Sequence, residues 1–123
     1  VLFRSEEKEE SQPTKESEGD RELEDEMAKL LLYLQQGVVL GDYAEALHIP
    51  ERKLSVFINS TYGVSFKRWV NNKRVEYATE QMAKHPDYTM ERIAELSGFA
   101  HKSHFCKIFR EITGGSFTEY KNR

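Results

Sequence analysis

The residues most able to recognise another molecule lie on the outer faces of two short amphipathic stretches. On a helical wheel that turns the apolar side chains inward, the first stretch places outermost Arg52, Val56 and Asn59, with Lys53 and Ser55 beside them. Guanidinium, ammonium, hydroxyl and amide groups donate hydrogen bonds to phosphate oxygens and to the edges of bases. Such a face is typical of a surface that binds a nucleic acid.

The second stretch, near the C-terminus, repeats this arrangement. Its outermost side chains are Ser103, Lys107 and Arg110, with His104 and Cys106 beside them. Neither outer face has an acid at these positions, although the chain holds 21 acidic residues and Glu51 and Glu111 lie at the ends of the two stretches. Solvated surfaces ordinarily mix both signs of charge, so two equivalent faces without carboxylates favour a phosphate-bearing partner.

The two stretches belong to an internal repeat with an offset of 51 residues. Apolar and turn residues coincide at seven positions, which are Leu54, Phe57, Ile58, Gly63, Ser65, Phe66 and Trp69 in the first copy and Phe105, Ile108, Phe109, Gly114, Ser116, Phe117 and Tyr120 in the second. Each copy has the pattern of a short helix, a tight turn and a second amphipathic helix, which is the helix-turn-helix arrangement. The paired aromatic residues of the repeat are expected in the core.

Every apolar run follows a period of three to four residues, so we expect an all-α protein of about seven helices. The expected helices span about 21–36, 41–47, 51–61, 66–84, 89–96, a sixth that carries the second outer face, and 117–122. Asp42 and Glu45 have the spacing of a capping box, and Pro50 suits the start of a helix. Ser65 can cap the fourth helix, which Pro86 must end.

The long helix expected over 66–84 joins the two copies and sets their separation. At 1.5 Å per residue its roughly 19 residues rise about 28 Å, while successive major grooves on one face of B-DNA lie about 34–36 Å apart. Two recognition helices on such a spacer could enter adjacent grooves of a bent duplex. We therefore expect a first helix-turn-helix over about 40–62, a linker helix over 66–84 and a second helix-turn-helix over about 89–113.

Charge is divided unevenly along the chain. Residues 1–26 contain eleven acids and four bases, a formal charge of −7, whereas residues 27–123 carry +4. Residues 1–20 are almost free of apolar groups after Phe3, which predicts a disordered acidic linker or tail before a domain over 21–123.

The single Cys106 is typical of a reducing compartment, and no apolar run is long enough to span a membrane. Because the chain does not begin with Met, we expect it to be part of a longer protein.

Other kinds of site find less support. His101, His104 and Cys106 are close in sequence but do not share a helix face, and nothing completes a four-ligand set, so we expect no metal and no cofactor. No activated nucleophile, carboxylate pair or phosphate-binding glycine loop indicates an enzyme, and we expect no small-molecule site. A helical bundle whose repeat serves packing alone stays open. So does a protein–protein adaptor of the sigma or anti-sigma type, which exposed apolar groups on both outer faces would favour, and only Val56 is such a group.

The sequence resembles the DNA-binding domain of the AraC/XylS family of bacterial transcription regulators. The segment "IAELSGFAHKSHFCKIFREITGGSFTEYK" near the C-terminus and "RVEYA" over 74–78 carry the resemblance, which covers about 27–123. There are departures from the family pattern: Pro50 stands where a Ser or Thr usually caps, Phe117 replaces the usual Pro, and Gly115 replaces an aliphatic residue. They concern caps and packing rather than the outer faces.

The resemblance implies a homeodomain-like paired helix-turn-helix fold whose two recognition helices read major grooves of double-stranded DNA. The base-contacting positions of the family fall on Arg52, Ser55, Val56, Ser103, His104 and Lys107, in agreement with the wheel. By chemistry, Arg52 and Lys107 can bond guanine, and Val56 suits a thymine methyl group. We assign Lys53, Asn59, Lys102 and Arg110 to the DNA backbone.

The resemblance also implies partners beyond DNA. A sensor or effector domain is expected to precede this domain in the intact protein, and RNA polymerase is an expected partner. The expected location is the cytoplasm, with the cytoplasmic part of a membrane-bound sensor-regulator as a variant. We expect Arg74 to be a structural residue of the linker helix that pairs with a carboxylate or a carbonyl.

Overall fold

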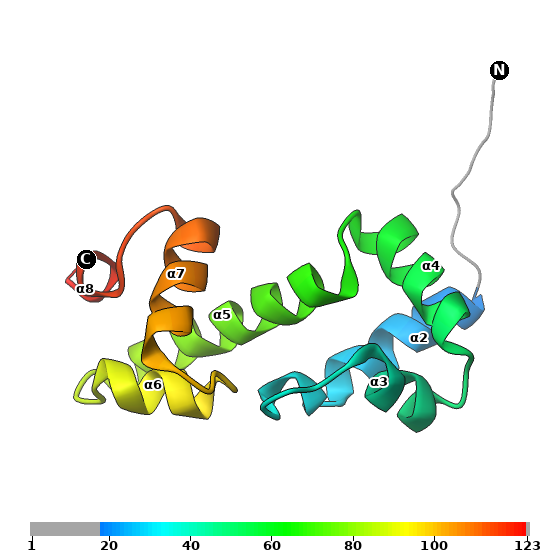
Figure 1. Ribbon diagram of the computed structural model, residues 1–123, viewed down its shortest axis with the longest axis horizontal. Coiled ribbons are helices and arrows are strands. Elements are labelled where there is room, and N and C mark those ends of the chain that lie inside the picture. Colours follow the sequence, from blue (N-terminus) through cyan, green and yellow to red (C-terminus); the bar gives the residue numbers. More distant parts are fainter. Residues whose placement is uncertain (1–17, 123) are drawn as a thin grey trace, which may run out of the picture. The chain divides into compact units, whose positions relative to one another are not determined.

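The computed structural model describes residues 18–122, and in this range the chain is all-helical, as expected (Figure 1). Its elements are α2 (Glu18–Lys29), the 3-10 helix η1 (Leu32–Leu34), α3 (Leu40–Leu47), α4 (Glu51–Tyr62), α5 (Phe66–Lys84), α6 (Met90–Leu96), α7 (Lys102–Thr113) and α8 (Phe117–Lys121). The chain divides after residue 30 into two compact bodies. The N-terminal body contains α2, and the C-terminal body contains all later elements. Figure 1 shows α4 and α7 on either side of α5.

The first helix differs from the expectation of 21–36. It spans Glu18–Lys29, so residues 18–20, expected in the disordered tail, form its first turn; the rest of that expected tail lies outside the described residues. The chain then forms the short 3-10 helix instead of a longer α-helix. The reason is tertiary: Tyr33 donates its N–H to the Tyr43 hydroxyl over 3.0 Å, and the carbonyls of Tyr33 and Gln35 accept from Arg74. Backbone groups used in this way are not available to a helical ladder.

The first helix-turn-helix consists of α3 and α4. The capping box expected from Asp42 and Glu45 is wrong, because α3 begins one residue earlier and Asp42 occupies its third position, where its carboxylate accepts the Val39 N–H over 2.9 Å. Pro50 immediately precedes α4, as expected at a helix start. Gly63 ends α4 with φ of 72°, a left-handed conformation that favours glycine.

The remaining helices begin and end close to where local residues predict. The linker helix α5 spans Phe66–Lys84 as expected, and its cap Ser65 accepts the Arg68 N–H through its hydroxyl over 3.2 Å. α7 ends at Gly114, whose φ is 83°, just as α4 ends at Gly63. In the capping box of α8, Ser116 and Glu119 accept each other's backbone N–H groups. Serine caps and left-handed glycines therefore recur at the repeat spacing of 51 residues.

Each helix-turn-helix packs on its own end of α5. Trp69 is the centre of an aromatic cluster in the first, with ring centroids 5.4 Å from Tyr43 and 6.1 Å from Tyr62. The second has a phenylalanine core, made of Phe99, Phe105, Phe109 and Phe117 together with aliphatic residues of α5 and α6. Of the four aromatic residues expected in the core, Trp69 and Phe117 are buried, whereas Phe66 and Tyr120 are half-buried.

Arg74 holds η1, α5 and the second helix-turn-helix together. Its Nε donates to the Tyr33 carbonyl over 2.6 Å and its Nη2 to the Gln35 carbonyl over 2.9 Å, which confirms the expected structural role. The guanidinium carbon lies 5.4 Å from the ring centroid of Phe99. Burial lowers the pKa of Arg74 from its ordinary value. Gly98 completes this junction, since its φ is 92° and a Cβ there would lie 2.8 Å from the Tyr33 carbonyl oxygen.

Candidate nucleic-acid interface

The outer face of α4 carries the side chains that the wheel placed there. Arg52, Lys53 and Asn59 are exposed, and Ser55 is half-buried. Val56 is 61% exposed, so it points to solvent rather than packing against a neighbouring helix. The Asn59 amide donates to the Ser55 carbonyl over 3.0 Å, which holds this side chain along the helix. The exposed apolar group is unusual on a solvated face and leaves a methyl-sized contact open to a partner.

The outer face of α7 is also exposed, with one correction. Lys102, Ser103, His104, Lys107 and Arg110 are all exposed. Cys106, expected beside them, is half-buried, and its Sγ lies 3.1 Å from Sδ of Met90, so this thiol faces α6. The sequence wheel missed this because it does not contain the neighbouring helix.

Two ion pairs involve bases of this interface. Lys102 Nζ lies 3.1 Å from Glu91 Oε2. A hydrogen bond from its own backbone and the bond from Lys102 lower the pKa of the Glu91 carboxyl. Arg68 Nη1 lies 3.9 Å from Glu111 Oε1, between α5 and α7, with both side chains close to half exposed. Exposed pairs of this kind contribute little to stability, so these bases can exchange partners at small cost.

A polar groove of about 300 Å³ lies between α5 and α7. We call it the central groove, and its lining residues are Ser65, Lys67, Arg68, Asn71, His104, Lys107, Ile108 and Glu111. It joins His104 and Lys107, which the sequence singles out, to Lys67, Arg68 and Asn71, which it does not. The sequence held a signal for Lys67 and Arg68, because two adjacent bases are unfavourable in the first turn of a helix.

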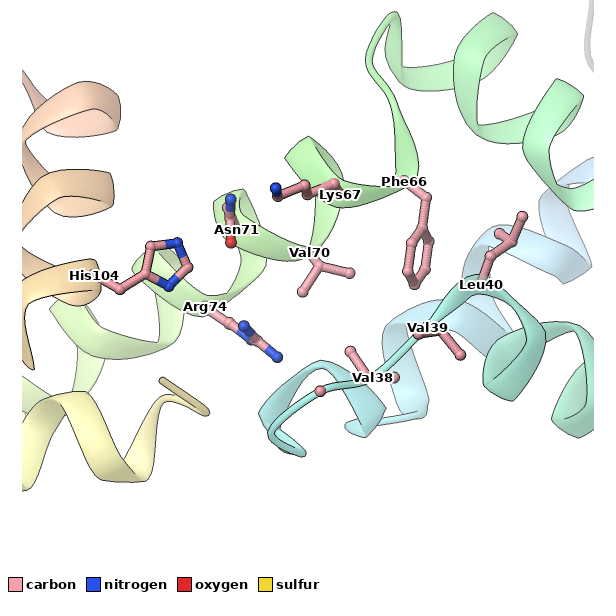
Figure 2. A pocket seen from close by; sticks show the side chains of 10 residues that line it. Val38, Val39, Leu40, Phe66, Lys67, Val70, Asn71, Arg74 and His104 are labelled. Carbon is pink, nitrogen blue, oxygen red and sulfur yellow. The ribbon is translucent and has the colours of Figure 1, made fainter. Parts of the chain in front are cut away.

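An apolar pocket of about 330 Å³ adjoins the central groove (Figure 2). Val38, Val39, Leu40, Phe66 and Val70 form its apolar wall. Lys67, Asn71 and His104 line both hollows, and Figure 2 shows the Asn71 amide between the other two side chains. The surface between the two recognition helices is therefore hollowed, with basic and amide groups along its edge.

Over residues 18–122, no three side chains of His, Cys, Asp or Glu are grouped so as to hold a metal ion. No helix within the same range has the length and apolar character needed to cross a membrane.

Comparison with known sequences identifies the class of this domain. Residues 43–123 match the sequence profile described as a helix-turn-helix domain. The chain is 30% identical to the regulatory protein PocR of Salmonella typhimurium over 105 residues, which cover 82% of this chain and 34% of PocR. It is 30% identical to the HTH-type transcriptional regulator YijO of Escherichia coli over 80 residues, covering 65% of this chain and 28% of YijO. The chain thus spans about a third of the length of these relatives.

Solved structures share the fold. The C-terminal domain of AraT, a response regulator from Geobacillus stearothermophilus, matches with a TM-score of 0.72 at 25% identity, over 86% of this chain and 85% of that one. The DNA-binding domain of AdpA, solved with a target DNA, matches with a TM-score of 0.69 at 22% identity, over 81% and 89% of the two chains. The fold and the matched profile define a DNA-binding domain of transcription regulators. The chain belongs to the AraC/XylS family of helix-turn-helix regulators.

Proposed function

We propose that this domain binds an asymmetric DNA site by inserting α4 and α7 into successive major grooves. The observation that carries the proposal is the pair of exposed outer faces, without carboxylates at their outermost positions, on two equivalent helices joined by the 19-residue α5. One chain would then present two recognition helices, as a helix-turn-helix dimer does with two chains. Because the two faces differ in sequence, their half-sites would differ.

The proposed readers of bases are Arg52, Ser55, Val56, Ser103, His104 and Lys107. Arg52 and Lys107 would donate to guanine O6 and N7, and the exposed Val56 would contact a thymine methyl group. We assign Lys53, Asn59, Lys102 and Arg110 to the backbone, where contacts position the protein without reading sequence. Lys102 would leave Glu91 to do so, and Asn59 would keep or exchange its bond to Ser55.

The context of the domain follows the family. We assign 40–62 and 89–113 to the two helix-turn-helix units, 66–84 to the linker helix, and residues before about 20 to a link with a sensor or effector domain. RNA polymerase is the proposed partner during transcription. The proposed location is the cytoplasm, where bacterial DNA is found, and the proposed role is regulatory rather than enzymatic.

The experiment is selection of bound sequences from a random duplex pool, followed by affinity measurements against salt. We expect a two-part asymmetric operator and an affinity that falls steeply with salt. Arg52→Ala and Lys107→Ala should each relax the preference at a different half-site, with a loss of discrimination of about 1–3 kcal/mol per base pair. Lys84→Ala, an exposed lysine at the far end of α5, is the matched control.

Failure of wild type to bind DNA even at low ionic strength would overturn the proposal. The same faces should then be tested for a protein partner. If the DNA reading holds, both alanine variants lose sequence preference at their own half-site while the control variant keeps wild-type behaviour.

A further inference from the structure

The central groove between α5 and α7 has the chemistry of an anion site. Lys67, Arg68 and Lys107 bring three permanent positive charges to it, and His104 brings an ionisable ring. Glu111 is the one carboxylate among the lining residues, and it already lies 3.9 Å from Arg68. The balance of charge in the groove is therefore positive.

Asn71 provides an independent observation. This residue is only 7% exposed, and its side chain lines both the central groove and the adjoining pocket. Figure 2 shows the amide between Lys67 and His104. The two N–H donors of an amide match the oxygens of a phosphate, and the surrounding burial holds this side chain in place. The amide lines the groove and is placed to donate to a ligand there.

The first turn of α5 is also unfavourable by itself. It contains Lys67 and Arg68 and no acid, although the positive end of a helix dipole favours carboxylates. The repeat shows the alternative: Glu119 of α8 stands at the position equivalent to Arg68 and accepts the Ser116 N–H over 2.9 Å. An anion bound in the groove would face both bases and the helix terminus, which turns an unfavourable arrangement into a favourable one.

We propose that the central groove binds a phosphate of the DNA strand that crosses between the two major grooves. This inference rests on the proposed function and extends it, because α5 becomes a third DNA-contacting element between α4 and α7. Lys67, Arg68 and the Asn71 amide hold the phosphate, which leaves Lys107, on the opposite wall of the groove, to the bases. Glu111 opposes the phosphate and competes for Arg68. The contact fixes the register of both recognition helices without reading sequence.

The test compares affinity against salt for wild type, Lys67→Ala and the control Lys84→Ala. Both lysines are exposed on α5, but only Lys67 lines the groove, and 17 residues place them about 25 Å apart along the helix. We expect Lys67→Ala to lower the slope of log affinity against log salt by about 0.9, the value for one phosphate contact. It should weaken binding to operator and random DNA by the same factor, on the order of threefold to tenfold. Lys84→Ala should leave both quantities unchanged.

Glu111→Gln tests the groove in the opposite direction. Removing this carboxylate releases Arg68 to the phosphate, so binding to both kinds of DNA should tighten by about the same factor. Fluorescence of Trp69, the single tryptophan, reports whether each variant is folded.

The outcomes separate the two proposals. The groove assignment is overturned if Lys67→Ala and Glu111→Gln both behave like Lys84→Ala while Arg52→Ala and Lys107→Ala still weaken binding; the proposed function then stands. An effect of Lys67→Ala confined to one operator base pair would also overturn it, because that result means base reading. Absence of DNA binding by wild type overturns both proposals.

Discussion

The two helix-turn-helix units, α3 with α4 and α6 with α7, have the same turns but different cores. Both recognition helices end at a left-handed glycine, and both are followed by a serine-capped helix. The first core is an aromatic cluster around Trp69, in which the Tyr43 hydroxyl accepts a backbone hydrogen bond. The second is built of phenylalanines without such a bond among its rings. The geometry of a helix-turn-helix thus depends on its turn residues, whereas different apolar side chains can fill its core.

The units also differ at the helix that follows each of them. Glu119 completes the capping box of α8, whereas its equivalent Arg68 points its side chain to Glu111 of α7. Local stability is best served by the acid, so the base in the first unit indicates a contact elsewhere. Glu119 thus stabilises its own helix, whereas the proposed phosphate contact accounts for Arg68 at the equivalent position.

The largest expected effects come from the equivalent core positions Leu54 and Phe105, which are both fully buried. Phe105→Ala should lower the free energy of unfolding by about 3–5 kcal/mol and Leu54→Ala by about 2–5 kcal/mol. Urea unfolding followed by Trp69 fluorescence reports on the first unit, and far-ultraviolet circular dichroism reports on all helices. Because α5 and Arg74 connect the units, we expect both signals to shift together in each variant. A Trp69 transition that Phe105→Ala leaves unchanged would mean that the units unfold independently.

Glycine substitutions give the next largest effect. They compare Gly98, which lies against η1, with Gly114, which ends α7 in an open turn. Gly98→Ala places a Cβ 2.8 Å from the Tyr33 carbonyl oxygen at a φ of 92°, so strain and overlap should together cost about 2–4 kcal/mol. Gly114→Ala has a similar φ of 83° but nothing within 4 Å of its Cβ, and should cost about 1–2 kcal/mol. Thermal unfolding of the two variants measures the difference. Equal losses would show that the close approach of Gly98 to η1 contributes nothing.

Tyr43→Phe removes the hydroxyl group that distinguishes the first core from the phenylalanine core of the second unit. Removing the hydroxyl leaves the Tyr33 N–H without its acceptor and should cost about 1 kcal/mol at neutral pH. Burial raises the pKa of Tyr43 above its ordinary value of 10.0. The neutral hydroxyl therefore contributes fully below pH 10.0, and its contribution is lost as the pH rises through the folded-state pKa. Unfolding by urea between pH 8 and 11 should show a smaller alkaline loss in Tyr43→Phe than in wild type, whereas an identical pH profile would exclude Tyr43 as the source.

The smallest effect concerns the two serine caps. Ser65→Asp keeps a cap on α5 and adds a carboxylate beside Lys67 and Arg68, so it should stabilise the protein by about 0.3–1 kcal/mol. Ser116→Asp should gain less, because Glu119 already supplies a carboxylate to that helix. Urea midpoints at low salt compare the pair. Equal gains would contradict the view that the first turn of α5 is electrostatically unfavourable.

Most of the helical framework was predictable because its signals are local. Pro50, Gly63, Ser65 and Pro86 mark helix ends by their own backbone and capping chemistry, and α5 begins and ends where they predict. The outward faces of α4 and α7 also follow from helical periodicity alone, since nine of their ten proposed DNA-contacting side chains are exposed. Their contacts with DNA stay a prediction. The error at Asp42 is one of register, because this residue lies three positions after the actual cap, Val39, and serves as the third residue of the helix.

Sequence alone specifies the two repeated patterns, the order of helices from α3 onward and the apolar stripe of each helix, because these depend on residues within a few positions of one another. The break before η1 depends instead on tertiary contacts, because the carbonyls of Tyr33 and Gln35 accept hydrogen bonds from Arg74, which lies 41 and 39 residues away along the chain. Tertiary packing also turns Cys106 toward Met90 and brings Lys67 and Asn71 together with His104 and Lys107 in one groove. Contacts between distant segments depend on how helices pack, and no local pattern contains that information.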